Sequence, residues 1–244
     1  ALGEVYVTGE TNGGIFPTTI NAYDTTANGG KDVFLSQLSA DGTTLLYSTL
    51  LSGSGHDAAY HMVVDSNGQI YLTGETSSSD FPTTNNTFDT IANGGFDAFV
   101  AKINPSLTGL GQLVYSTYYG GAKSDVGYGL TIDAFGNAYV AGRTFGTIPT
   151  TANAFNTLKP GSDDGFLFKL NSTGTTLLYS TYFGGTSSEF IDSVALDSNG
   201  NVFIAGLTGS SGLATSGAFD ETGSGQEAII AKLQLIWRRK CRFT

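Results

Sequence analysis

The sequence predicts an all-β fold, a β-propeller built from four-stranded antiparallel blades. Three observations lead there: short segments of β-forming residues recur with a period of about 65 residues, tight-turn sequences separate them, and glycine supplies 34 of the 244 residues. The segments are too short for helices, and four-stranded units in tandem are the blades of a propeller. About four repeats fit into the chain, and the first and the last are incomplete.

Each complete repeat contains four predicted strands, which we call A to D. Strand A lies near residues 60–64, 129–132 and 193–196. Strand B is the unit Val5-Tyr6-Val7-Thr8-Gly9, which returns from Ile70, Ala138 and Val202. Strand C follows an acid, at Asp32, Asp97, Asp164 and Glu227. Strand D is the unit Leu45-Leu46-Tyr47-Ser48-Thr49, which returns from Leu113 and Leu177.

The connection from strand A to strand B has the sequence of a tight hairpin. It reads Asp65-Ser66-Asn67-Gly68 in one repeat and begins with Asp133 and Asp197 in the next two. Glycine at the fourth place accepts the positive φ that such a turn requires. Because hairpins join antiparallel neighbours, the main alternative, a parallel β-solenoid, fits the sequence poorly.

The repeats divide residues 1–233 into blades of approximately 1–55, 56–123, 124–187 and 188–233. The last segment, 234–244, departs from the repeat and holds the only Trp, the only Cys and four of the 11 basic residues. It is either a divergent strand D or a segment foreign to the repeat. Since the first repeat lacks a strand A, we expect an imperfectly closed ring or an array that pairs with another copy through open blade edges.

Composition excludes several classes of partner. The chain has 21 acidic and 11 basic residues and a net charge of −10, which disfavours nucleic acid as a ligand. No apolar run approaches the roughly 18 residues of a membrane span. A single cysteine excludes a disulfide framework and a multi-cysteine zinc site.

Three acids in the D-to-A connections, Asp57, Asp125 and Glu189, are the first candidates for a ligand site. Each follows the strand D tyrosine by ten residues, and these connections lie at the mouth of the central channel on the face that carries the long B-to-C loops. Converging carboxylates would suit calcium or the acid and base of a glycosidase. The alternative is one structural hydrogen bond in each blade.

A second set of candidates occupies one position near the end of strand B, where the blades differ. Glu10, Glu75 and Arg143 stand there in the first three repeats, and Leu207 in the fourth. Variation at a fixed site is typical of a specialised surface, although drift produces the same pattern. No residues are assigned to catalysis. None are assigned to a metal either, because His56 and His61 are five residues apart at a loop–strand junction, and the H-E-x-x-H zinc motif needs two histidines four residues apart on a helix.

The sequence resembles the bacterial SBBP family of β-propeller repeats. The matching motifs are 5–9 with Phe16-Pro17-Thr18-Thr19, the segment 95–102, and 177–185 running to 197–201. The resemblance implies a propeller within a secreted or surface-attached bacterial protein, extracellular or periplasmic, and no defined reaction. We therefore expect a non-catalytic binding or scaffold module without a cofactor, which takes a polysaccharide or protein ligand on its long-loop face. The alternative is a carbohydrate-active enzyme, a glycosidase or lyase, that uses Asp57, Asp125 and Glu189.

Overall fold

The computed structural model describes residues 3–12, 14–223 and 225–233, which form four antiparallel sheets. The first sheet contains β1 (Val5–Thr11), β2 (Asp32–Leu38) and β3 (Leu45–Leu51). The second contains β4 (Asp57–Val64), β5 (Ile70–Thr76), β6 (Asp97–Ile103) and β7 (Leu113–Tyr119). The third contains β8 (Asp125–Ile132), β9 (Ala138–Thr144), β10 (Asp164–Leu170) and β11 (Leu177–Phe183). The fourth contains β12 (Glu189–Leu196), β13 (Val202–Thr208) and β14 (Glu227–Leu233).

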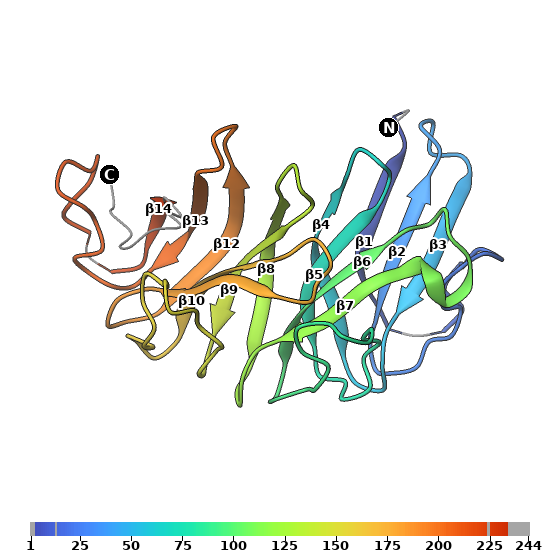
Figure 1. Ribbon diagram of the computed structural model, residues 1–244, viewed down its shortest axis with the longest axis horizontal. Coiled ribbons are helices and arrows are strands. Elements are labelled where there is room, and N and C mark those ends of the chain that lie inside the picture. The colour runs from blue at the N-terminus through green and yellow to red at the C-terminus, as the bar shows by residue number, and fades with distance from the viewer. Residues whose placement is uncertain (1–2, 13, 224, 234–244) are drawn as a thin grey trace.

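The sheets follow one another along the longest axis of the molecule, from the blue first sheet to the orange and red fourth sheet (Figure 1). Every sheet is a simple meander, and the two middle sheets have all four strands in chain order. The all-β prediction is therefore confirmed, and among the described residues the first sheet begins with strand B. The first and fourth sheets lie at opposite ends of the row, so the sheets do not close into a ring. The segment 234–244, where strand D of the fourth repeat would follow, lies outside the described residues.

The predicted hairpins form as expected. Asp65 accepts hydrogen bonds at Oδ1 from the backbone N–H groups of Asn67 and Gln69, at 2.8 and 2.9 Å. Gly68 adopts φ 75°, and the glycines at the same place in the next two repeats, Gly136 and Gly200, adopt 76° and 78°. Aspartate and glycine at these places set the turn.

The prediction for strand A was wrong at its start. The strands β4, β8 and β12 begin at Asp57, Asp125 and Glu189, three or four residues earlier than expected, so these acids are the first residues of strands and do not lie in the loops. The reason is a backbone hydrogen bond to the preceding sheet. The N–H of each acid donates to the carbonyl oxygen of the residue that precedes strand C. These bonds run from Asp57 to Lys31 (2.9 Å), from Asp125 to Phe96 (2.7 Å) and from Glu189 to Asp163 (3.0 Å).

A β-bulge interrupts each strand A. The pairing with strand B shifts by one residue at Tyr60, Tyr128 and Asp192, which have no partner in the ladder. The bulge brings the backbone oxygen of Val126 so close to Gly142 of strand B that a Cβ there would lie 1.9 Å from it. The same approach occurs at Gly74 and Gly206, which explains why strand B carries a glycine at this place.

The hydrophobic core lies between the sheets. We call the side of a sheet that faces the next sheet along the chain its front face, and the other side its back face. At the first junction, the front face of the first sheet packs on the back face of the second, and the buried residues include Val33, Leu35, Tyr47, Ile70 and Leu72. Two further clusters fill the second and third junctions in the same way.

The insertion in the middle repeat adds a bond between sheets. It forms a short 3₁₀ helix, η1 (Gly109–Gln112), that ends in a buried glutamine. Oε1 of Gln112 accepts a hydrogen bond of 2.6 Å from the Tyr47 hydroxyl, and Nε2 donates to the Asn21 carbonyl at 2.6 Å. Within the described ranges, the chain has no helix with the length and hydrophobicity needed to cross a membrane.

Candidate functional site

The three acids predicted at the channel mouth are completely buried. Asp57 accepts a hydrogen bond at Oδ2 from the N–H of Gly53 (2.7 Å). Its carboxylate also accepts bonds from the hydroxyls of Thr76 and Ser78. The side chain therefore ties the D-to-A turn to the end of strand B, which is the structural role that the sequence left open.

Asp125 and Glu189 repeat this arrangement in the next two sheets. Gly121 donates its N–H to Oδ2 of Asp125 at 2.7 Å, and Gly185 donates to Oε2 of Glu189 at 2.9 Å. Thr208, which ends strand B as Thr76 does, donates its hydroxyl to Oε1 of Glu189 at 2.8 Å. All three acids are 0% exposed, so none of them presents a carboxylate to a solute at the surface.

Each buried acid lies beside the acid that begins strand C of the preceding sheet. A Cβ built on Gly120 would lie 2.4 Å from Oδ1 of Asp97 and 2.7 Å from Oδ2 of Asp125, so the two carboxyl groups face each other across this glycine. Burial, with the charge of Asp97 as a smaller cause, raises the pKa of Asp125 to about 7. At the next junction, the Lys159 ammonium lies 3.2 Å from Oδ2 of Asp164, which is paired with Glu189.

The carboxyl groups come together in pairs within single junctions and do not converge on one cavity. In the part of the chain that the structure describes, no three His, Cys, Asp or Glu side chains form a group that could hold a metal ion. Of the two histidines, His56 bonds to Glu10 through Nε2 at 3.0 Å, and Nδ1 of His61 accepts the N–H of Leu130 at 3.1 Å. Both are thus engaged within the protein.

A row of three aromatic rings crosses β4, β8 and β12, the first strands of the second, third and fourth sheets. The rings of Tyr60 and Tyr128 stack with centroids 5.3 Å apart and an interplanar angle of 27°. Tyr128 also contacts Phe190 at 4.5 Å, with the rings tilted by 46°. Tyr60 is 45% exposed, and Tyr128 and Phe190 are partly exposed. We call Tyr60, Tyr128 and Phe190 the axial aromatic row.

The bulges explain why the row exists. Tyr60 and Tyr128 are the extra residues of their bulges, and an unpaired bulge residue is turned away from the regular alternation of the strand. In the fourth sheet the bulge residue is Asp192, and Phe190 supplies the ring from two residues earlier. The row therefore passes over three consecutive sheets, although the residues that form it are far apart in sequence.

The second set of predicted residues flanks this row. Oε1 of Glu75 accepts a hydrogen bond of 2.7 Å from the Tyr60 hydroxyl. Burial, followed by the bond to Glu75, raises the pKa of Tyr60 above its ordinary value. Burial and then Glu75 also raise the pKa of Tyr128. The tyrosines therefore stay neutral hydrogen-bonding groups over the physiological pH range.

Arg143 and Glu10 lie near the two ends of the row. The Arg143 guanidinium pairs with Asp163 and lies over the rings of Phe145 and Phe190, 4.6 and 5.7 Å from their centroids. Beside it is a hollow of about 210 Å³, to whose lining Arg143, Glu189, Phe190 and Leu207 belong. Glu10 pairs with Lys31 and His56. The structure thus places Glu75 and Arg143 directly on the row, and Glu10 in an ion-pair cluster of its own.

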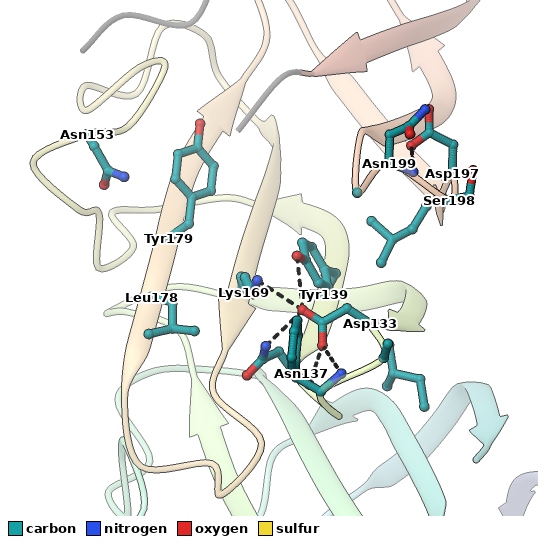
Figure 2. A pocket seen from close by; sticks show the side chains of 15 residues that line it. Asp133, Asn137, Tyr139, Asn153, Lys169, Leu178, Tyr179, Asp197, Ser198 and Asn199 are labelled. Carbon is teal, nitrogen blue, oxygen red and sulfur yellow. Dashed lines mark hydrogen bonds and ion pairs between the residues drawn. The ribbon is translucent and has the colours of Figure 1, made fainter. Parts of the chain in front are cut away.

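A larger recess lies elsewhere, between the A-to-B hairpins of the third and fourth sheets. It has a volume of about 780 Å³, and its lining includes Asp133, Tyr139, Lys169, Tyr179 and Asp197. Figure 2 shows Asp133 bonded to Asn137, Tyr139 and Lys169.

The repeat explains this recess. One junction earlier, Tyr115 occupies the place of Tyr179, and the C-to-D turn of the third sheet covers it: a Cβ on Gly174 would lie 2.5 Å from the Tyr115 ring. In the fourth repeat, the corresponding turn follows Leu233, outside the described residues. A second recess of about 600 Å³ lies along β14, where strand D runs in the other sheets. Neither recess is therefore assigned to a ligand.

Sequence reasoning missed the axial aromatic row, although two signals pointed to it. An aromatic residue follows the acid by three places in two repeats, at Tyr60 and Tyr128. The glycine within strand B also indicates a bulge in the neighbouring strand, since glycine in a strand interior marks a close backbone approach. In the long loop of the second repeat, Phe81 is buried against Phe99, with ring centroids 4.7 Å apart, and so packs within the protein.

Tandem antiparallel sheets that pack front to back, each built on the same turns and acids, define a protein of β-sheet repeats. The family model for the SBBP beta-propeller repeat matches this chain three times, at residues 46–82, 114–148 and 178–214. The resemblance is confirmed, and the chain carries three SBBP repeats. Each match runs from strand D of one sheet through strands A and B of the next, so it spans one junction and one ring of the axial row. Among the curated proteins, no match to the chain was found.

Proposed function

We propose that the chain is a non-catalytic binding module for neutral oligosaccharide chains, and that the ligand lies along the axial aromatic row. The observation that carries this proposal is the pair of stacked rings, Tyr60 and Tyr128, partly exposed and continued by Phe190. An aromatic ring offers a flat apolar face, and a row of three such faces suits successive units of a linear polymer. SBBP repeats are consistent with a binding or scaffold role.

The polar groups beside the row support a sugar as the ligand. Ligand sites combine apolar and aromatic walls with a few polar groups that fix orientation. Here the carboxylate of Glu75, the hydroxyl of Tyr60 and the guanidinium of Arg143 lie around the rings. They can donate to and accept from the hydroxyl groups of a sugar, while its apolar face covers the aromatic rings.

Charge favours a neutral polymer over an anionic one. The chain has a net charge of −10, and, after burial, the carboxylates of Glu75 and Asp192 raise the pKa of Tyr128 against the one opposing charge, that of Arg143. An acidic polysaccharide would be repelled from this surface. We also propose a secreted or cell-surface location in a bacterium, where such a module would meet the polysaccharides of cell walls and extracellular matrices.

The enzyme alternative has less support. A glycosidase needs two carboxyl groups that reach the scissile bond. Asp57, Asp125 and Glu189 are 0% exposed and bonded to the turns that they hold. Their pattern of bonds explains why an acid recurs at each junction without any contact to substrate.

The experiment is a glycan array combined with product analysis. The wild-type chain and Asp125→Asn are applied to an array of neutral and acidic glycans, and the sugars that bind are then incubated with each protein and analysed for shorter products. We expect binding to neutral glycans by both proteins and no products. Release of shorter sugars that Asp125→Asn abolishes would overturn the non-catalytic assignment, and binding to acidic glycans alone would overturn the ligand class.

A further inference from the structure

The two ends of the row of sheets expose faces that are buried at every internal junction. On the front face of the fourth sheet, Ile230 is 80% exposed. The residues at the same place in the first three sheets, Leu35, Val100 and Leu167, are 0% exposed because the next sheet covers them. The front face of the fourth sheet has the composition of a junction and no following sheet among the described residues.

The back face of the first sheet shows the complementary exposure. Val5 and Val7 of β1 are 44% and 39% exposed. The corresponding residues of the second sheet, Ile70 and Leu72, are both 0% exposed, and Val202 and Ile204 of the fourth are 0% and 1% exposed. An apolar strand surface that is sealed in every later sheet is therefore open in the first.

We propose that the front face of the fourth sheet binds the back face of the first sheet of a second copy of this chain, which continues the row head to tail. The contact would repeat an interface that the chain already makes three times, with residues at the same positions of strands B and C. On one side it would bury Ile230 and Phe203, and on the other Val5, Val7 and Phe34. Burial of these side chains is the driving force.

This contact is heterologous, because two different surfaces of the chain meet. It also differs from pairing through open strand edges, since it uses side chains on the faces of β14 and β1 and leaves their backbone edges untouched. Two copies joined at both ends would form a closed ring of eight sheets, which lies within the range of known propellers of about 4 to 8 blades.

The heterologous geometry allows a sharp test by sedimentation equilibrium of the full chain. The wild-type chain is expected to form dimers or larger assemblies of the 25.4 kDa unit. Ile230→Asp and Val7→Asp each destroy one of the two faces, so each variant alone should be monomeric. An equimolar mixture should recover a dimer, because each variant still carries the intact face that the other lacks.

Ile91→Asp is the matched control, since Ile91 is also an exposed isoleucine, at 67%, but lies in a loop of the second repeat away from both end faces. It should assemble like the wild type, and thermal unfolding would verify that all variants fold. A wild-type chain that stays monomeric at every concentration would overturn the proposal. An assembly that survives both Ile230→Asp and Val7→Asp, or variants whose mixture stays monomeric, would do the same.

Discussion

The ring of Tyr60 stacks on the ring of Tyr128 at a centroid distance of 5.3 Å, although the two residues belong to different sheets. Both are the unpaired residues of β-bulges at the same place in strand A. In the second and third sheets, the same backbone device therefore accompanies one junction and supplies one ring of the row. The acids at the start of these strands hold the junction, and the bulge residues supply the surface.

The first prediction concerns the buried acids. Asp57→Ala should lower the free energy of unfolding by about 2 kcal/mol or more, because the N–H of Gly53 and the hydroxyls of Thr76 and Ser78 would lose their buried acceptor. Urea unfolding followed by circular dichroism measures the change. Residues placed for catalysis often cost stability, so an Asp57→Ala variant as stable as the wild type would argue against the structural role.

The second prediction concerns pH. The pKa of Asp125 is raised by burial to about 7 in the folded protein, from an ordinary value of 3.8. The neutral carboxyl therefore favours the folded state, so its contribution to stability is complete below about pH 4 and is lost as the pH rises through 7. Asp125→Asn cannot ionise and should gain stability relative to the wild type between pH 4 and 8.

Unfolding of both proteins in urea across this pH range provides the measurement. The quantity of interest is the difference between the two free energies of unfolding, because Asp57 and Asp164, at the other two junctions, also have raised pKa values and contribute to both proteins alike. A difference that stays constant with pH would show that Asp125 does not titrate in this window.

The third prediction concerns the glycine of strand B. In Gly142→Ala the new methyl group would lie 1.9 Å from the backbone oxygen of Val126, which cannot move away as a side chain would. We expect a loss of about 1 to 3 kcal/mol or more in the free energy of unfolding. Gly9→Ala is the matched control, because the same position in the first sheet meets only the Phe34 ring, at 3.1 Å. Equal losses in both variants would contradict the role assigned to the bulge.

Much of the fold could be predicted because turn chemistry is local. Asp65 and Gly68 specify their hairpin through bonds within five residues, and the apolar units between such turns have the length of strands. The start of strand A was misplaced because a bond to Lys31 of the preceding sheet sets the position of Asp57, and no local pattern reveals that bond.

The candidate site was harder to predict for a similar reason. Asp57, Asp125 and Glu189 looked like surface groups because acids usually lie at the surface, and only the contacts between sheets show that they are buried. Glu75 and Arg143 were found because the repeats differ at their position. Tyr60 and Tyr128 meet only after two bulges change the direction of their side chains, which alternation in the sequence does not encode.

The central claim is that the axial aromatic row contacts the ligand, and isothermal titration with four neutral hexasaccharides tests it directly. The probes are cellohexaose, laminarihexaose, xylohexaose and chitohexaose, titrated into the wild type, Tyr128→Ala and the control Phe135→Ala, whose ring is 83% exposed in a hairpin outside the row. We expect at least one probe to bind, with Kd about tenfold or more weaker for Tyr128→Ala and unchanged for Phe135→Ala. Equal binding by all three proteins, or binding of none of the probes by the wild type, would contradict the claim.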